Sequence, residues 1–483
     1  MFKNKNSVAA LTLSLACLCF TFTHTINAAE PATPLSPAQD MEGNWSGILA
    51  GNLRLNLHVK KSADGTYTAI LESVDQGHAM IPVNKLDVSA DHLVLSVAAV
   101  HGSYDAKWDD KASAWIGTWT QGQGLPLTFT RMNGDIPKAK RPQEEAIEAG
   151  PTPYNQQIVT FDGGAAKVRL AGTFSMPTGK GPFPAVILVA GSGPQTRDED
   201  VAGHKIFLVL SDFLTRHGIA VLRYDKRGTG KSTGNYNNAT TVEFTADAAA
   251  AATYLRSRPE VDVHHIGLIG HSEGGEIVPA VAAKDAGISF IVLLAGPGIR
   301  GDKLLAEQIY LIDKASGVPD EHGTIDRKTN EEIFTAVADA ANESDAKIKA
   351  ETLFNKALEE HRVFGDVDKA KASLNYLTSP WMRYFLSYDP APALRLVTVP
   401  VLALNGSLDL QVPPEQDLDA IKDALRNNKD VTVVELPNLN HLFQTASMGT
   451  PAEYGVIEET IDPAALTVIG DWVTAHSKQV KSQ

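Results

Sequence analysis

The sequence predicts an α/β fold with a mostly parallel sheet, preceded by a small all-β domain and interrupted by a helical insertion. Short strands that alternate polar and apolar residues fill residues 41–133. From residue 157 onward, strands that are apolar throughout alternate with helices, which is typical of a parallel sheet covered on both faces. Residues 299–390 interrupt this alternation with a long helical pattern.

Length and composition are those of a folded protein with two or three domains. The chain has 483 residues, of which 43% are hydrophobic and 21% are charged. Its formal net charge is −14 at pH 7. Because so acidic a surface repels nucleic acid and anionic lipid, we expect neither as a partner. No oligomeric state follows from these numbers.

Residues 1–28 have the features of a secretory signal peptide. Two lysines near the start precede an apolar stretch over residues 8–22, which is short for a membrane span. Small residues follow at Ala28 and Ala29, where we expect cleavage. The mature protein is therefore expected to be periplasmic or secreted, with no membrane span after signal removal. A lipid anchor on Cys17 is the alternative.

Both cysteines of the chain, Cys17 and Cys19, lie inside this leader. The mature protein would then have no disulfide, no thiolate metal site and no cysteine nucleophile. The adjacent pair His264 and His265 lacks the spacing of metal ligands. We expect no metal and no cofactor.

The β-rich domain is expected over residues 41–133. The segments 53–61 and 66–74 alternate apolar and polar residues around an Asp64-Gly65 turn, and similar strands continue to residue 131. Such spacing predicts a small barrel or sandwich. Four of the six tryptophans lie here, forming either a ligand-binding patch or, as we favour, core and strand-end packing: Trp45, Trp108, Trp115 and Trp119.

Residues 134–156 are rich in proline, glycine and charge, and are expected to form a linker or a surface strap. Residues 157–483 are expected to form the α/β domain, beginning with a hairpin. Its strands are predicted at 184–191, 219–225, 265–270, 290–296, 399–406 and 431–437, and its helices near 203–217, 242–257, 273–285, 414–427 and 463–477.

The insertion over residues 299–390 is predicted to form a helical cap. Residues 329–362 contain little glycine or proline and many strong helix formers. An insertion of this size at the ligand end of a parallel sheet is expected to form a lid. Its aromatic end either lines a substrate pocket or packs the cap onto the core, through Trp381, Tyr384 and Phe385.

The pattern Gly-x-Ser-x-Gly, which marks the nucleophile of many serine hydrolases, occurs twice. The match Gly270–Gly274 follows a predicted strand directly and precedes a predicted helix, as a nucleophile on a sharp strand-to-helix turn requires. Glycines on either side relieve the crowding of that turn. Ser272 is therefore the predicted nucleophile.

The other match, RGTGKSTG around Ser232, lies in a loop and lacks this context. It also resembles the end of a phosphate-binding loop, but that motif needs glycine where the chain has Asp225. We interpret it as a glycine-rich connection, braced by an ion pair between Asp225 and Arg227.

A serine nucleophile needs a base, and the base needs a carboxylate that orients it. His441 follows the predicted strand 431–437, and Asp409 follows the predicted strand 399–406. Both therefore lie at strand C-terminal ends, where the sites of such sheets gather. Asp417 and Asp430 remain alternatives for the acid.

A tetrahedral intermediate needs hydrogen-bond donors for its oxyanion. One donor is expected to be the backbone N–H of Glu273, which follows the nucleophile. The second is expected after the strand 184–191, from the N–H of Ser192 or of Gly193, because Pro194 has none.

With these residues in view, the chain resembles the α/β-hydrolase superfamily and, within it, the two-domain bacterial carboxylesterases of the EstD-like group, whose hydrolase domain is similar to that of serine aminopeptidases. The matching stretches are AGSGPQTRDE (190–199), VLRYDKRGTGKS (221–232), GHSEGG (270–275), NGSLDLQVP (405–413) and NHLFQ (440–444). The resemblance implies an α/β-hydrolase fold with a cap, a triad of Ser272, Asp409 and His441, and esterase activity on short acyl chains.

The first hypothesis for function is a serine carboxylesterase that hydrolyses small-molecule esters through an acyl-enzyme. The second is a serine aminopeptidase on the same fold, in which Glu273, Glu276 or an acid of the cap holds the substrate's amine. The third is a protein that binds a glycan or lipid through the tryptophan-rich domain.

Overall fold

The structure is a computed structural model that describes most of the chain from residue 41 to residue 477. The expected signal peptide and both cysteines lie outside the described residues. Also outside are residues 50–52, 63–64, 75–78, 90, 98–99, 101, 122, 133–139 and 365–366. The described chain divides into two units, one of residues 41–140 with 451–458, and one of residues 141–450 with 459–477.

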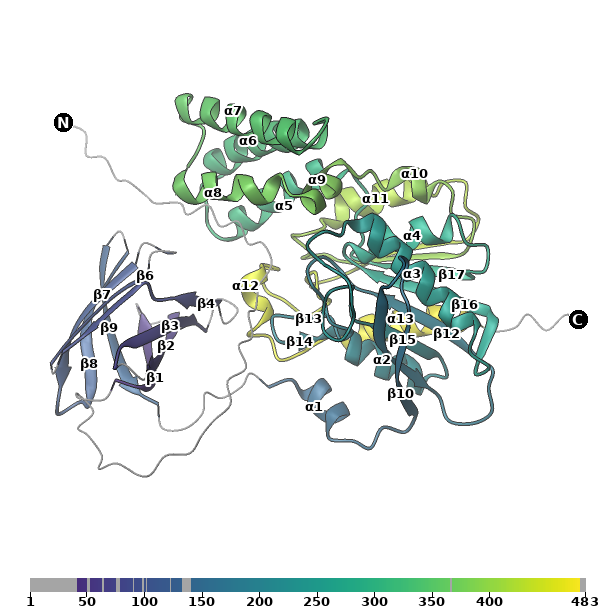
Figure 1. Ribbon diagram of the computed structural model, residues 1–483, viewed down its shortest axis with the longest axis horizontal. Helices are drawn as coiled ribbons and strands as arrows, with labels where there is room; N and C mark the ends of the chain where they lie inside the picture. The colour runs from purple at the N-terminus through teal and green to yellow at the C-terminus, as the bar shows by residue number, and fades with distance from the viewer. Residues whose placement is uncertain are drawn as a thin grey trace, which may run out of the picture. The chain divides into compact units, whose positions relative to one another are not determined.

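The N-terminal unit is one antiparallel sheet that curves into a half-barrel (Figure 1). Within the described residues it has nine strands in the order β4-β3-β2-β1-β9-β8-β7-β6-β5. It therefore agrees with the barrel alternative more than with a two-sheet sandwich. The strands are β1 (Gly43–Leu49), β2 (Leu53–Lys61), β3 (Tyr67–Ser73), β4 (Ala79–Pro82), β5 (Lys85–Val88), β6 (His92–Val97), β7 (Gly102–Asp109), β8 (Ala114–Gln121) and β9 (Gln123–Arg131).

Tryptophans form much of the core of this half-barrel. Trp45, Trp115 and Trp119 are each at most 2% exposed. Trp108 packs edge-on against both Trp45 and Trp115. Because aromatic rings bury a large apolar area, they stabilise the curved sheet that the described residues form. The tryptophans therefore serve packing rather than an exposed aromatic patch.

The second unit is built on a sheet of eight strands within the described residues, in the order β10-β11-β15-β12-β16-β17-β18-β19. The first two strands form an antiparallel hairpin, and β11 also pairs antiparallel with β15. From β15 to β19 in this spatial order, including β12, neighbouring strands are parallel. The strands are β10 (Asn155–Asp162), β11 (Arg169–Met176), β12 (Phe183–Val189), β15 (Ala220–Tyr224), β16 (Val261–His271), β17 (Phe290–Leu294), β18 (Val401–Gly406) and β19 (Val431–Leu436).

Helices cover both faces of this sheet (Figure 1). Helix α2 packs against α1 and α13, whereas α3 packs against α4. Because both faces are covered, central strands such as β17 are buried at every residue, which explains their apolar sequences. The helices are α1 (Pro142–Glu148), α2 (Ile206–Arg216), α3 (Thr241–Arg256), α4 (Gly274–Ala282), α10 (Ala391–Leu394), α11 (Pro414–Ala424) and α13 (Pro463–His476).

The insertion between β17 and β18 is helical, and its first helices gather on one side of the sheet (Figure 1). Helix α5 packs against α6 and α9, and α6 packs against α7. The side chain of Asn342 caps α7 by accepting the N–H of Asp345. These cap helices are α5 (Gly301–Ala315), α6 (Asp320–Ala338), α7 (Glu343–Glu359), α8 (Val367–Leu377) and α9 (Pro380–Ser387).

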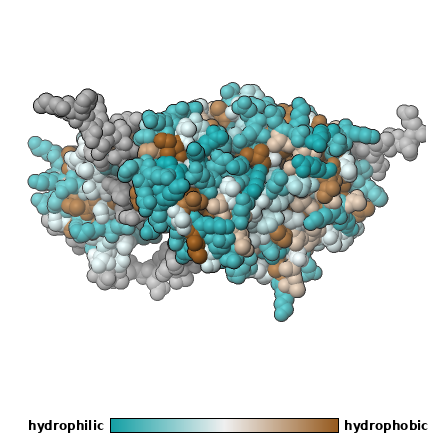
Figure 2. Space-filling model, turned by 90° about the horizontal axis from the view of Figure 1, so that it is seen from above, coloured by the Kyte–Doolittle hydropathy of each residue, from teal (hydrophilic) through white to brown (hydrophobic). Residues whose placement is uncertain are grey.

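The surface is mixed in character. On the face drawn in Figure 2, hydrophobic residues form small separate groups among hydrophilic ones. In the part of the chain that the structure describes, no helix is long and apolar enough to cross a membrane.

Candidate active site

Ser272 occupies a strained turn between a strand and a helix. Strand β16 ends at His271, and α4 begins at Gly274. The φ angle of Ser272 is +52°, in the left-handed region that non-glycine residues rarely adopt. Ser272 is partly exposed, whereas His271 and Glu273 on either side are buried. The turn therefore presents one hydroxyl at the carboxyl edge of the sheet.

The two glycines of the pattern are required by close packing. A Cβ on Gly274 would lie 2.0 Å from the carbonyl oxygen of Val189, and one on Gly270 would lie 2.1 Å from the carbonyl oxygen of Gly274. Backbone atoms cannot move aside as a flexible side chain can. Only glycine therefore lets the helix begin this close to the strand and hold the turn.

His441 and Asp409 form a buried hydrogen-bonded pair beyond the ends of β19 and β18. His441 Nδ1 lies 2.8 Å from Asp409 Oδ2, and both side chains are almost fully buried. The other carboxylate oxygen accepts the backbone N–H groups of Gln411 and Val412. These bonds fix the carboxylate, which in turn holds the proton on Nδ1 and leaves Nε2 as the basic nitrogen.

The alternative acids have other partners. Asp417 accepts the N–H of Gly298, and burial raises its pKa to about 7. Asp430 lies 3.5 Å from the imidazole of His476. Of the three acids, Asp409 is the one whose carboxylate is hydrogen-bonded to His441.

His271 connects the serine turn to the loop that carries His441. Its Nε2 lies 2.9 Å from the main-chain oxygen of His441, and the two rings lie 4.9 Å apart. Its Nδ1 lies 3.0 Å from Glu199 Oε1. Burial alone would lower the pKa of His271, but the attraction of Glu199 and these hydrogen bonds raise it. Since both ring nitrogens face acceptors, the imidazolium form fits this position.

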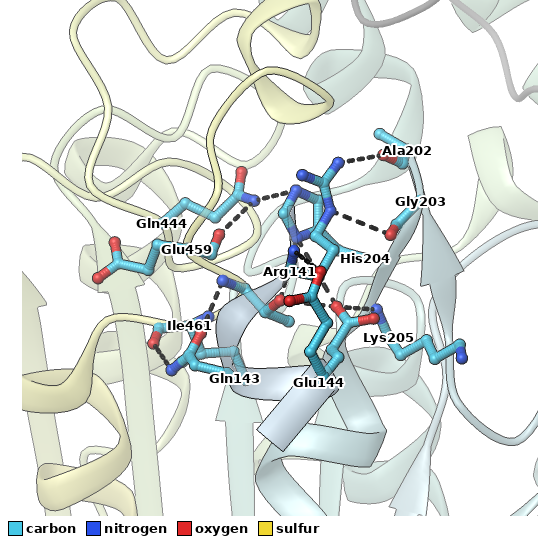
Figure 3. A network of polar contacts seen from close by, with 12 residues as sticks. Arg141, Gln143, Glu144, Ala202, Gly203, His204, Lys205, Gln444, Glu459 and Ile461 are labelled. Carbon is cyan, nitrogen blue, oxygen red and sulfur yellow. Dashed lines mark hydrogen bonds and ion pairs between the residues drawn. The ribbon is translucent and has the colours of Figure 1, made fainter. Parts of the chain in front are cut away.

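The loop around His441 is also fixed from within. The side-chain oxygen of Asn440 accepts the N–H groups of Leu442 and Gln444. The Gln444 amide reaches the imidazole of His204 and the carbonyl of Glu459 (Figure 3). These bonds hold the loop rigid where it carries the proposed base.

Helix α1 supports the same region, although it belongs to the stretch 134–156 that was expected to be a linker or strap. The Gln143 amide bonds to the backbone of Thr460 and Ile461, and Glu144 bonds to Thr460 and to the N–H of Lys205 (Figure 3). Residues 142–148 are thus part of the framework of the second unit.

The loop after β12, where the second oxyanion donor was expected, touches the serine turn. A Cβ on Gly191 would lie 3.0 Å from Ser272 Cβ. The Gly191 N–H donates to Glu199 at 2.5 Å, and its carbonyl accepts from Lys226 Nζ at 2.6 Å. Ser192, the expected donor, follows Gly191 directly in this loop.

The side chain of Glu273 lies at the centre of a buried polar cluster. Lys226 donates to Oε2 at 2.8 Å, and Thr241 and Trp381 donate to Oε1 at 2.7 and 2.9 Å. The Trp381 indole belongs to cap helix α9. The residue after the predicted nucleophile is therefore bonded to the cap as well as to the core.

The three aromatic residues predicted at the site lie on α9 and have different surroundings. Trp381 points its indole N–H at Glu273 and stacks on Phe385 with ring centroids 5.5 Å apart. Phe385 is buried, with Trp381 stacked on its ring. Tyr384 is partly buried and stacks on Tyr388.

The Ser232 loop has a structural role. Ser232 is buried; its hydroxyl donates to the carbonyl of Asp225 and accepts the N–H of Ala171. The predicted ion pair between Asp225 and Arg227 is wrong. Asp225 instead pairs with Arg197, which offers both its backbone N–H and its guanidinium. Arg227 pairs with Asp247.

Three charged residues of the site were given no role in the sequence analysis: Glu199, Lys226 and His271. Only His271 carried a visible signal, as the polar residue that directly follows the buried apolar run over residues 266–270. His265, in contrast, pairs with Asp262. Among the described residues, no group of three or more metal-binding side chains is placed to hold an ion.

Comparison with known proteins assigns this arrangement to a class. The sequence model of the alpha/beta hydrolase family matches residues 186–454, more than half of the chain. The chain belongs to the alpha/beta hydrolase family and is a hydrolase.

The chain is also similar to individual proteins. The chain is 26% identical over 331 residues to Esterase EstD of Thermotoga maritima, covering 67% of this chain and 68% of that protein. An uncharacterized 31.7 kDa protein of Escherichia coli is 26% identical over 260 residues, 53% of this chain and 82% of its own. Among solved structures, the Pyrococcus furiosus esterase Pf2001 aligns over 71% of this chain and all of its own, with 15% identity and a TM-score of 0.42.

Proposed function

We propose that the protein is a serine carboxylesterase that hydrolyses short-chain carboxylic esters, with Ser272 as nucleophile, His441 as base and Asp409 as the orienting acid. The single observation that carries the proposal is the bond of 2.8 Å between His441 and Asp409, on a loop bonded to the residue before Ser272. Similarity to Esterase EstD supports an ester as the substrate.

The proposed reaction follows the usual two stages of acyl transfer. His441 Nε2 takes the proton of Ser272 as its oxygen attacks the ester carbonyl. The tetrahedral oxyanion accepts hydrogen bonds from the N–H groups of Glu273 and Ser192. The C–O bond to the alcohol breaks, and the alcohol takes the proton from His441. Water, deprotonated by His441, then attacks the acyl-enzyme, and the carboxylic acid leaves with Ser272 restored.

The aminopeptidase alternative is less well supported by the acids near Ser272. Glu273 already accepts hydrogen bonds from Lys226, Thr241 and Trp381, which occupy both of its oxygens. Glu276 is fully buried, and burial and the nearby Glu273 raise its pKa well above the usual range. A carboxyl held neutral in this way offers no charge to a substrate ammonium group.

The proposed location is the periplasm or the extracellular medium, on the basis of the leader over residues 1–28. Fractionation of cells that express the full chain or a chain starting at residue 29 tests it. We expect activity outside the cytoplasm only with the leader present, and cytoplasmic retention of the full chain would contradict the proposal.

Labelling with a fluorophosphonate, followed by peptide mapping, tests the nucleophile. We expect label on Ser272, and label on Ser232 or on no serine would refute the mechanism. Comparing p-nitrophenyl butyrate with aminoacyl anilides tests the substrate class. Faster cleavage of the anilides would favour the peptidase.

A further inference from the structure

The peptide that joins Gly191 to Ser192 is held by a buried lysine. The Gly191 carbonyl accepts from Lys226 Nζ at 2.6 Å, and Lys226 is only 4% exposed. The same ammonium donates to Glu273 Oε2 at 2.8 Å and lies 4.3 Å from the centre of the Phe244 ring. Lys226 thus spans the two backbone segments from which the oxyanion donors are proposed to come.

The geometry of the peptide bond gives this contact a consequence for the site. In a planar trans peptide, the carbonyl of one residue and the N–H of the next point in opposite directions. An ammonium that fixes the Gly191 carbonyl therefore fixes the Ser192 N–H on the opposite side. A Cβ on Gly191 would lie 3.0 Å from Ser272 Cβ, so this peptide borders the side chain of the proposed nucleophile.

The local sequence leaves this peptide in need of an anchor. Glycines flank Ser192 on both sides, and Gly193 has a φ of +93°. Glycine has a wide choice of backbone angles, so the peptide between Gly191 and Ser192 has little intrinsic preference for one orientation. Glu199 holds the N–H of Gly191, but it does not bond to the peptide that carries the proposed donor.

We propose that Lys226 is a positioning residue for the oxyanion hole. Its ammonium holds the Gly191 carbonyl so that the Ser192 N–H faces the developing oxyanion, and it polarises that peptide so that the N–H becomes a stronger donor. Lys226 acts only through the peptide and does not touch the substrate. The inference rests on the proposed esterase function.

An experiment on Lys226 has to distinguish the effect of its ion pair with Glu273 from the effect of its bond to the Gly191 carbonyl. Replacing Lys226 alone would leave a buried carboxylate without its counter-charge, which destabilises the fold. The decisive comparison is therefore between E273Q and K226M/E273Q in the full chain. E273Q keeps the lysine on the Gly191 carbonyl and offers it an amide oxygen in place of the carboxylate, whereas the double variant removes both charges. Because E273Q leaves a buried ammonium without its counter-charge, kinetics are compared only on samples of both variants that are shown to be folded.

We expect the double variant to lose about 10²-fold in kcat relative to E273Q, as for loss of one oxyanion donor, with KM changed less than about threefold. Binding of butylboronic acid, which forms a tetrahedral adduct, should weaken by about the same factor, while competitive inhibition by butyrate stays unchanged. K231M, at an exposed lysine of the same loop, is the matched control and should behave as the wild type.

Equal kcat and equal boronate affinity in E273Q and K226M/E273Q would overturn the role of Lys226. If the double variant does not fold, K226R replaces it, because a planar guanidinium keeps the charge but not the compact donor. K226R should lose about tenfold in kcat and boronate affinity, and wild-type values would overturn the proposal. A wild-type enzyme that takes no fluorophosphonate on Ser272 would instead remove the proposed function itself, and this inference with it.

Discussion

Two loops of this chain share the pattern Gly-x-Ser-x-Gly, yet their serines have opposite surroundings. The Ser232 hydroxyl is buried and bonded to two backbone groups, so it holds a loop together. Ser272 is partly exposed on a backbone held at a φ of +52° between buried neighbours. The pattern alone does not make a nucleophile. What distinguishes Ser272 is the junction of strand and helix, which forces the strained turn and frees the hydroxyl.

Close to each of the two serines, a buried carboxylate is bonded to a positively charged side chain. Asp225 is bonded to Arg197 beside Ser232, and Glu273 is bonded to Lys226 beside Ser272. The two cations differ in the other groups that they contact. Arg197 reaches the hydroxyl of Thr173, whereas Lys226 reaches the backbone at Gly191 beside the serine turn. Similar ion pairs therefore serve a structural loop in one place and the proposed site in the other.

The largest expected effect is that of removing each hydroxyl in turn. We expect S272A to lower kcat for p-nitrophenyl butyrate by at least about 10⁴-fold, because no acyl-enzyme can form. We expect S232A to retain activity and to lose ~1–3 kcal/mol of unfolding free energy, since it leaves two buried backbone groups unsatisfied. Urea titration and steady-state kinetics measure both. A fully folded but inactive S232A would contradict the structural role given to Ser232.

The next effect concerns the acid. We expect D409N to lower kcat by about 10³–10⁴-fold, because an amide favours the wrong tautomer of His441. D417N is the matched control, since Asp417 is also buried but bonds to the N–H of Gly298. Steady-state kinetics on folded samples separate them. An equal loss of kcat in both variants would mean that Asp409 has no special link to the serine turn.

The sequence predicts an all-β domain, a mostly parallel sheet, a helical cap and the three residues of the proposed triad because these follow from local patterns, but it leaves open whether the all-β domain is a barrel or a sandwich. Ser272, Asp409 and His441 each lie at the end of an apolar strand, and parallel strands bring such ends together. The contacts of Lys226 and Glu199 could not be predicted in this way. Each depends on how loops far apart in sequence pack, and the failed pairing of Asp225 with Arg227 shows that a short separation is a poor guide to ion pairs.

The raised pKa of Asp417 should also change how the free energy of unfolding depends on pH. Burial raises its pKa to about 7 in the folded chain, above the value near 4 of an unfolded aspartate. The folded state therefore binds the proton more tightly, and this residue lowers stability as the pH rises from about 4 to about 7. We expect D417N to be more stable than the wild type by ~2–4 kcal/mol above pH 7, with the difference vanishing below about pH 4. Urea titrations across this range measure it, and a constant difference would contradict the assignment.

The smallest expected effect tests whether the Ser272 turn, unlike the Ser232 loop, is coupled to the cap. W381F removes the indole N–H that reaches Glu273 but keeps an aromatic ring stacked on Phe385. Thr241 and Lys226 still hold the carboxylate, so we expect kcat/KM to fall by less than about tenfold, which is below the roughly 1.5–3 kcal/mol that a hydrogen bond to a charged group contributes. The matched control is Y384F, at the neighbouring cap tyrosine, for which the carboxylate cluster is unchanged and we expect kcat/KM close to that of the wild type. A larger fall in kcat for W381F would show that the cap indole is as important to the turn as the lysine beneath it. Identical kinetics in the two variants would show instead that the turn is held by the core alone.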